Sequence, residues 1–508
     1  MKTFGRKTIY ANYTENQLLS GTQEERDNRV LDIIENSIQI HDRNNIETRY
    51  LQNYLYGDQD IKTKTKLTRQ DINNINVENW AYACMDWKKA FLLGKPIQYA
   101  PLDDKANGEI TSLNKYSVFE DKDEKDQELY ESLFTVGRAF RFVKPSKITE
   151  DDETPYNLIN ADVENTEVVY SSSIEHEQLL SYIKTSNKYI IQEVNPDTGK
   201  PENVEKNYDE YTVYTKDMVY TINNKSDSYV IIDRKPLILK THLITEYYFN
   251  KKRISLLEIV KDILNDINKV ENLDLDDIES FVNAIMVFTN AEVNKEGMEK
   301  IKEYGAVSIK STDQKKASVE LLQSRLKSLD TQIYYLRKIT ALHNILSIPL
   351  ASNNGDVSNA ETGKGMLVGQ GFTSASVRIE NEEKSFKKCD RNSLKVILKI
   401  CKESRGSKIK NLKVSDIDIK FSRDLSDNLL TKTTALLNLA TAQIPPEIRN
   451  ATVGLFSDPV AVTKLQEKYI KEQREIQQEI KKRNNNENNI NQNMNKEEDS
   501  KQIENQGQ

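Results

Sequence analysis

The sequence predicts an α+β protein in which helices predominate. Three observations support this prediction. Residues 24–54 form a long charged stretch without Gly or Pro, which is typical of a helix. Residues 156–248 contain short β-branched and aromatic runs separated by turn residues, which indicates a β-rich module. Beyond residue 255, apolar residues recur at steps of three and four, which predicts further helices.

The composition indicates a protein with a real core and a large wetted surface, since 37% of the 508 residues are hydrophobic and 30% are charged. No run of about 18 apolar residues occurs, so no membrane span is expected, and the first residues do not resemble a secretory signal. The net charge is −7. Because proteins that grip phosphates usually carry a basic surplus, any contact with DNA should be weak, sliding or confined to a small patch.

The first half of the chain divides into helices and then strands. The helix at 24–54 should end at the turn Tyr56–Asp58, and a second helix at 76–93 should end at Gly94–Pro96. The β-rich module follows, with four predicted strands at 167–170, 188–191, 211–214 and 229–232.

Two long helices with a short mixed segment between them are predicted next. Residues 255–282 would form a helix about 42 Å long, with an apolar seam of Leu256, Val260, Ile263, Ile267 and Val270. Residues 283–316 contain strand candidates at 287–288 and 307–309. The second helix, at 317–346, has the seam Val319, Leu322, Leu326, Leu329, Ile333 and Leu336.

The last part of the chain begins with a loop at 347–371, which contains Pro349 and Gly355. Helices are expected at about 375–402, 428–443 and 457–483, with a strand at 416–421. The polar tail from 484 to 508 should be disordered because it has almost no apolar residues to bury.

Motifs for catalysis and cofactor binding are not supported. Gly363-Lys364-Gly365 lacks the upstream Gly of a Walker A loop, where Ser358 stands, and a following Ser or Thr. The sequence has neither a Gly-x-Ser-x-Gly elbow nor a His-Glu-x-x-His motif. His343 is interpreted as structural, and the three cysteines form no Cys-x-x-Cys pair. We therefore predict no catalytic residues, no cofactor and no metal.

Two other patterns have competing interpretations. The carboxylates Asp274, Asp276, Asp277 and Glu279 resemble a metal site, but they lack the Gly of an EF-hand loop, so a solvated helix face or an acidic ring is favoured. The Tyr-rich strands offer surfaces for base stacking, but Tyr is also a common strand residue.

The order of parts, together with local motifs, resembles the SPP1-type family of tailed-bacteriophage portal proteins. YLYGD at 54–58 is similar to the family's Tyr-x-x-Tyr-Gly step, and FLLGKPI at 91–97 to its Leu-x-Gly-Lys-Pro-Ile helix end. VGRAF at 136–140, and ILSIP at 345–349 followed by ETGKG at 361–365, resemble further family elements. The chain departs from the family at Lys364-Gly365-Met366 and at Gln370, which affects the expected length and charge of the loop.

The resemblance implies a portal fold that forms a closed ring, a dodecamer in the virion. The implied parts are an N-terminal helical segment with a β-rich wing (1–254), a first stem helix (255–282), a clip (283–316), a second stem helix (317–346), a tunnel loop leading into a long helix (347–371), a long wing helix with a return strand (372–425), crown helices (426–483) and a disordered polar tail (484–508). In such a ring the helix seams should bury against neighbouring copies.

The resemblance also implies a role and partners. Double-stranded DNA would pass through the channel during packaging and ejection, and the ring would sit at one capsid vertex after assembly in the host cytoplasm. The terminase large subunit, the capsid and scaffolding proteins and a head-tail adaptor would bind it. Tunnel-loop candidates for DNA contact are Asn353, Asn354, Asp356 and Lys364; acidic lumen candidates on the first stem helix are Glu258, Asp262, Asp266, Asp274 and Asp277.

Two alternatives remain open from the residues alone. One is a helical adaptor or scaffold protein of the virion that forms no pore, which is compatible with the charged final helix and polar tail. The other is a nucleic-acid enzyme such as a nuclease or packaging ATPase, which the missing Walker A loop disfavours.

Overall fold

The computed structural model describes most of the chain: residues 4–67, 70–102, 106–146, 153–194, 201–225, 228–282, 285–289, 318–322, 328–349, 372–422, 429–453, 455–456 and 462–479. It divides into two compact units. Unit 1 consists of Met1–Gly355 with Val368–Arg423, and unit 2 of Asp356–Leu367 with Asp424–Gln508.

Unit 1 begins with helices, as predicted, although the helix predicted at 76–93 starts only at Trp80. Its first elements are β1 (Ile9–Ala11), α1 (Glu15–Leu19), α2 (Gln23–Leu55), η1 (Asp60–Thr63), α3 (Trp80–Leu93), β2 (Gln98–Pro101), α4 (Asn107–Phe119) and α5 (Lys122–Thr135). The helix predicted at 24–54 is confirmed. Thr22 and Glu25 form a capping box at its start, in which each side chain binds the other residue's backbone N–H. Gly57, just past its end, has a φ of 95°, which glycine adopts without strain.

The predicted β-rich module is confirmed and contains two sheets. Its strands are β3 (Arg138–Pro145), β4 (Tyr156–Ala161), β5 (Thr166–Ser171), β6 (Gln178–Val194), β7 (Pro201–Tyr214), β8 (Met218–Asn223), β9 (Val230–Pro236) and β10 (Ile244–Tyr248). The larger sheet has the order β1-β5-β6-β7-β8-β9, and the smaller one β10-β3-β4. Only β1 with β5 pairs in parallel; the other pairs in these two sheets are antiparallel.

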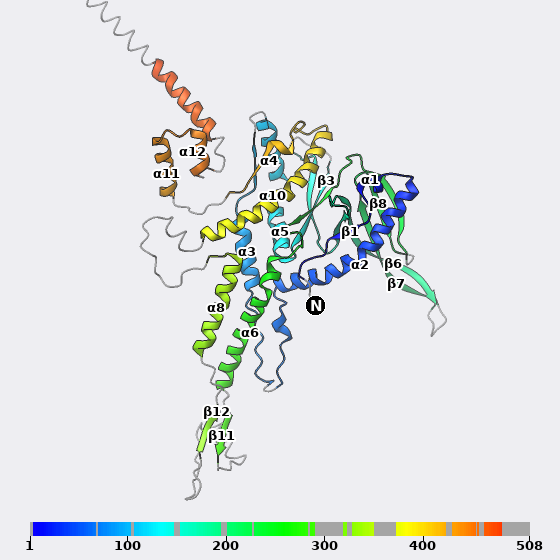
Figure 1. Ribbon diagram of the computed structural model, residues 1–508, viewed down its shortest axis with the longest axis vertical. Coiled ribbons are helices and arrows are strands. Elements are labelled where there is room, and N and C mark those ends of the chain that lie inside the picture. The colour runs from blue at the N-terminus through cyan, green and yellow to red at the C-terminus, as the bar shows by residue number, and fades with distance from the viewer. Residues whose placement is uncertain are drawn as a thin grey trace, which may run out of the picture. The chain divides into compact units, whose positions relative to one another are not determined.

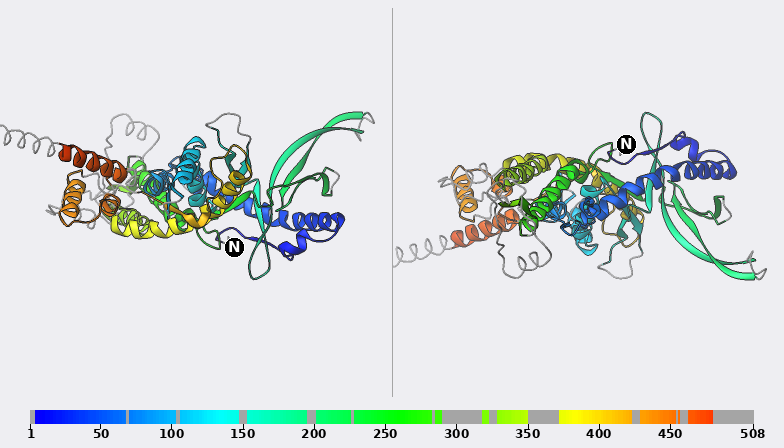
Figure 2. Two further views of the ribbon diagram at one scale, coloured as in Figure 1. Left: turned by 90° about the horizontal axis from the view of Figure 1, so that it is seen from above. Right: turned by 90° about the horizontal axis from the view of Figure 1, so that it is seen from below.

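Two hydrophobic clusters hold these elements together. Helix α2 packs on the larger sheet through Val30, Ile33 and Ile34, which meet Val169 and Leu180 among the buried residues of one cluster. The second cluster joins α3, α5, the smaller sheet and the helices that follow it. Beyond the larger sheet, β6 and β7 continue together as a long twisted ribbon (Figures 1 and 2).

A pair of helices follows the sheets: α6 (Leu256–Val282) and α8 (Ser328–Leu346) run side by side, and the antiparallel hairpin of β11 (Ile285–Thr289) and β12 (Ser318–Leu322) lies at their end (Figure 1). The strand candidate at 287–288 is confirmed, whereas the candidate at 307–309 lies outside the described residues.

The prediction of one helix from 317 to 346 is wrong for its first part. Residues 318–322 form β12 instead, and the helix begins at Ser328. A short apolar run such as this fits a helix or a strand equally well, and backbone pairing with β11 favours the strand.

Unit 1 ends with α10 (Phe372–Glu403), η3 (Val414–Asp416) and β13 (Ile417–Lys420), which pairs with β2. The predictions at 375–402 and 416–421 are therefore confirmed. Unit 2 contains α11 (Leu429–Thr441), α12 (Pro446–Val453) and a helix at 462–479. Pro446 opens α12, because the first helical position needs no backbone N–H. The predicted start of the final helix, Ser457–Pro459, and the tail from 484 lie outside the described residues.

Candidate functional site

The candidate site is the helix pair α6 and α8, together with residues 74–78, which bind along α6. The apolar seam of α6 is buried at Leu257, Val260, Leu264 and Ile267, which are 2% exposed or less. These side chains pack inside unit 1, where α6 contacts α3, α5 and α8. The expectation that the seam buries against neighbouring copies is therefore wrong for this part of α6, which is already buried within unit 1. Of the predicted seam residues, Val260 and Ile267 are buried, whereas Leu256, Ile263 and Val270 are only partly buried. Leu257 and Leu264, which were not in the predicted seam, are buried instead.

The start of α6 is anchored by Glu258. Its carboxylate accepts hydrogen bonds from the backbone N–H groups of Ser255 (2.9 Å) and Gly5 (3.1 Å), and it forms an ion pair with Arg6. Its own backbone N–H donates to the Ser255 hydroxyl (3.0 Å), which completes a capping box. Glu258 is 7% exposed. The prediction that it faces an open lumen is therefore wrong, because its charge is used to cap the helix and hold the N-terminus.

The other predicted acidic residues lie along α6 with different exposure. Asp262 is exposed, and Asp266, one turn further on, forms an ion pair with Lys338 of α8 (2.6 Å). Asp274 and Asp277 are half-buried. Burial and the neighbouring Asp274 carboxylate raise the pKa of Asp277. These four carboxylates share one helix, but no metal-binding group of three or more His, Cys, Asp or Glu occurs among the residues that the structure describes.

A row of buried polar side chains on α6, which we call the polar ladder, was not predicted. It consists of Asn268, Asn272 and Asp276, each 2% exposed or less. The ladder accepts backbone N–H groups from an extended segment: Glu78 donates to Asn268 (2.8 Å), Asn76 to Asn272 (2.6 Å) and Asn74 to Asp276 (2.7 Å).

The geometry of the ladder follows from the two backbones. Four residues of an α-helix rise about 6.0 Å, and two residues of extended chain rise about 6.6 Å. Every fourth residue of α6 therefore meets every second residue of the segment. Polar residues at spacing four beside an apolar seam were the sequence signal for this arrangement.

Charge fixes the far end of the ladder. Lys64 and Lys66 place their Nζ atoms 2.6 Å and 2.7 Å from the Asp276 carboxylate. Burial alone would raise the pKa of Asp276, but the hydrogen bonds from Lys64 and Lys66 outweigh it and hold this pKa well below its usual range. Residues 74–78 are therefore held along α6 by hydrogen bonds, and Lys64 and Lys66 are held there by an ion cluster.

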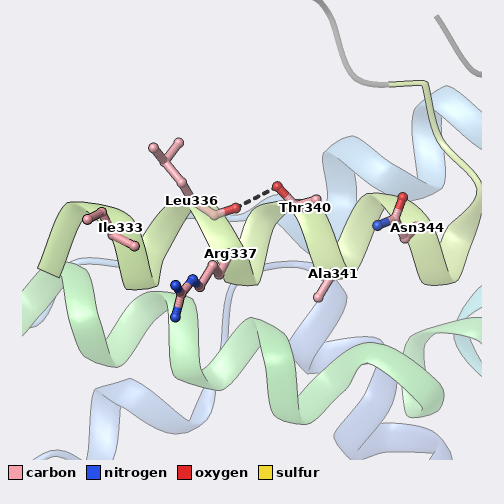
Figure 3. Close-up of a pocket in the computed structure, with 6 residues that line it drawn as sticks. All are labelled: Ile333, Leu336, Arg337, Thr340, Ala341 and Asn344. Carbon is pink, nitrogen blue, oxygen red and sulfur yellow. Dashed lines mark hydrogen bonds between the residues drawn. The ribbon is translucent and has the colours of Figure 1, made fainter. Parts of the chain in front are cut away.

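The outer face of α8 exposes large apolar side chains among polar ones. Ile333 is 40% exposed and Leu336 is 59% exposed. Together they line a shallow groove with Arg337, Thr340, Ala341 and Asn344 (Figure 3). On α6, Ile259, Leu273 and Ile278 are exposed as well. Both helices therefore carry large apolar side chains that stay exposed among the residues the structure describes.

The tunnel-loop candidates Asn353, Asn354, Asp356 and Lys364 lie outside the described residues. The helix α8, which precedes them, is followed by Ser347 at a φ of 53°, and the backbone N–H of Ile348 donates to the carbonyl of His343 (2.9 Å). This is a Schellman motif with serine at the position that glycine usually takes. The Nδ1 atom of His343 lies 3.3 Å from the carbonyl oxygen of Ile348. This contact within the helix end agrees with a structural role for His343.

The cysteines are buried, and burial raises the pKa of Cys84 and Cys401 to about 12 and that of Cys389 to about 11. Such thiols are protonated at neutral pH and are poor nucleophiles. Within the described part of the chain, no helix is both long enough and apolar enough to cross a bilayer.

Comparison with known proteins identifies one family. The family model described as "Phage portal protein, SPP1 Gp6-like" matches residues 34–486. No curated protein matches the sequence. The match covers strands β2 to β13, the helix pair and the described helices of unit 2.

Proposed function

Because this chain belongs to the SPP1-type phage portal protein family, a structural component of the virion, we propose that it forms a closed ring at one capsid vertex. Double-stranded DNA would enter through the ring during packaging and leave through it during ejection. The ring would also be the platform for the terminase and, later, for the head-tail adaptor. In this proposal the protein hydrolyses nothing itself.

The observation that carries the proposal is the helix pair with uncovered apolar faces. We assign α6 and α8 as the two stem helices. The clip, predicted at 283–316, becomes the whole segment 283–327 between them, because β12 pairs with β11. Ile333 and Leu336 on α8, and Ile259 and Leu273 on α6, are large side chains left exposed by this chain. A head-to-tail contact between copies that closes on itself would cover both faces at once.

The charge of α6 suits a channel for DNA. Asp262, Asp266, Asp274 and Asp277 are the residues we propose for the lumen, and Glu258 is no longer among them. An acidic wall repels phosphate, so a duplex slides through without being trapped. Asn353, Asn354, Asp356 and Lys364 remain the proposed loop residues for contact with the DNA backbone.

Electron microscopy of the purified full chain tests the ring. We expect rings with a central hole, and we expect the double variant Ile333→Asp, Leu336→Asp to give mainly monomers, because charged groups would have to be buried at each contact. Ile174→Asp is the matched control, since Ile174 is 96% exposed on a turn of unit 1 and should leave ring formation unchanged.

Monomers and small dimers of the unaltered chain, across a range of salt and protein concentration, would argue against the portal role. That outcome would favour a non-pore adaptor. Rings that persist in the Ile333→Asp, Leu336→Asp variant would show that the contact between copies lies elsewhere.

A further inference from the structure

Lys88 is a buried cation that contacts two helices from a third. It lies on α3 and is 2% exposed. Its Nζ atom lies 3.4 Å from the carbonyl oxygen of Leu346, the last residue of α8, and forms an ion pair with Glu382 of α10. These two helices flank residues 350–371, so one ammonium group joins the elements on both sides of that segment.

On the α10 side of this contact, side-chain hydrogen bonds hold the helix against the rest of unit 1. Glu382 also accepts a hydrogen bond from the hydroxyl of Tyr130 on α5 (2.7 Å). Two turns further along α10, Asp390 accepts hydrogen bonds from Tyr99 (2.9 Å) and Tyr247 (3.1 Å). Both carboxylates face the body of unit 1, so α10 is pinned to it at two points.

The α8 side is a helix C-terminus, where the last carbonyl groups have no partner within the helix. The partial negative charge there attracts a cation, and a buried lysine satisfies it without help from water. Arg378 of α10 donates a hydrogen bond to the neighbouring carbonyl of Ile345. The end of α8 is therefore bound by two cations, one from α3 and one from α10.

We propose that Lys88 is a positioning residue that couples the end of α8 to α10 and so sets the distance between the two points from which residues 350–371 depart. The coupling between the two helices does not depend on the proposed function. Only the link between residues 350–371 and a DNA channel rests on it. A replacement of Lys88 would disturb the end of α8 without disturbing the larger sheet.

Hydrogen exchange of the full chain, read by mass spectrometry, tests this coupling. Lys88→Met is expected to speed exchange by about tenfold or more in peptides covering 342–349, with little change in β5 and β8. Lys88→Arg should restore most of the protection, because it keeps a cation near both partners. Lys89→Met is the matched control: Lys89 is the next residue of α3, and its ion-pair partners are Asp86 and Glu131. It should leave 342–349 unchanged.

Lys88→Met leaves the carboxylate of Glu382, which is only 12% exposed, without its cation, and this can unfold the unit by itself. The triple variant Lys88→Met, Glu382→Leu, Tyr130→Phe removes the whole polar cluster and fills it with apolar groups. We expect it to melt as one cooperative unit, yet still to exchange faster at 342–349, because the Leu346 carbonyl has lost its donor.

If the triple variant exchanges as slowly as the unaltered chain at 342–349, Lys88 only balances Glu382 and the coupling is wrong. The same preparations viewed by electron microscopy separate the two proposals. Rings in every variant, with the exchange pattern absent, would overturn the coupling alone, whereas a chain that never forms rings would overturn the portal role alone.

Discussion

Replacing Asn272 with alanine would remove the middle position of the polar ladder. Asn272 accepts the backbone N–H of Asn76 (2.6 Å) and donates to the carbonyl of the same residue (2.7 Å). Each hydrogen bond contributes about 0.5–1.5 kcal/mol net, so the two together hold the segment with about 1–3 kcal/mol. Opening of the segment should therefore become roughly 5- to 150-fold more frequent.

The assay is hydrogen exchange at single amides, because the backbone N–H groups of Asn74 and Glu78 are protected by their hydrogen bonds to the ladder. The N–H of Asn74 binds Asp276, and that of Glu78 binds Asn268, so neither depends directly on Asn272. Both should exchange roughly 5- to 150-fold faster in the Asn272→Ala variant if the segment opens as a unit. Lys269→Ala, at an exposed position of the same helix, should change neither amide.

The reasoning would be refuted by loss of protection at Asn76 alone. Unchanged exchange at Asn74 and Glu78 would mean that each position of the ladder binds independently. The segment would then owe its place along α6 to Lys64 and Lys66 rather than to the row of side-chain amides.

Three further predictions follow from local chemistry. Ser347→Gly should stabilise the end of α8 by about 1 kcal/mol, seen as slower exchange at 342–349, because a left-handed conformation costs a residue with a Cβ roughly that amount; faster exchange would mean that the serine side chain is needed there. Hydrogen bonds from His242 and then Lys216 lower the pKa of Glu15 to about 2. A depressed carboxyl pKa stabilises the fold above the ordinary value of about 4.3, and this contribution is lost as pH falls toward 2. Acid titration of stability should therefore be flatter over that window in Glu15→Gln, and an unchanged slope would exclude Glu15 as a contributor. The three cysteines should react with a thiol reagent at pH 8 far more slowly in the folded protein than in guanidinium, and equal rates would show that they are accessible.

The main elements were predictable because their signals are local. The turn at 56–58 and the Gly-Lys-Pro stop at 94–96 mark helix ends through backbone chemistry that acts within a few residues. The strand runs at 167–170 and 211–214 lie within β5 and β7 for the same reason. The family was recognisable from the order of these elements together with short motifs such as YLYGD at 54–58.

Contacts between distant parts of the chain could not be predicted, since the local sequence pattern does not indicate which distant residue a side chain will contact. Glu258 reads as one more carboxylate on an acidic helix, but tertiary structure places Arg6 and Gly5 against it and buries it. Residues 318–322 became a strand because β11 offered backbone partners across a long separation.

The sequence by itself determined most of the helical and extended segments and the family to which they belong, because periodicity, caps and turns are properties of neighbouring residues. Only the tertiary structure decided the use of individual charges and amides. Lys88 contacts a carbonyl 258 residues away, and Asn272 one that is 196 residues away. The free energy of such contacts comes from burial and geometry that arise only once the chain has folded.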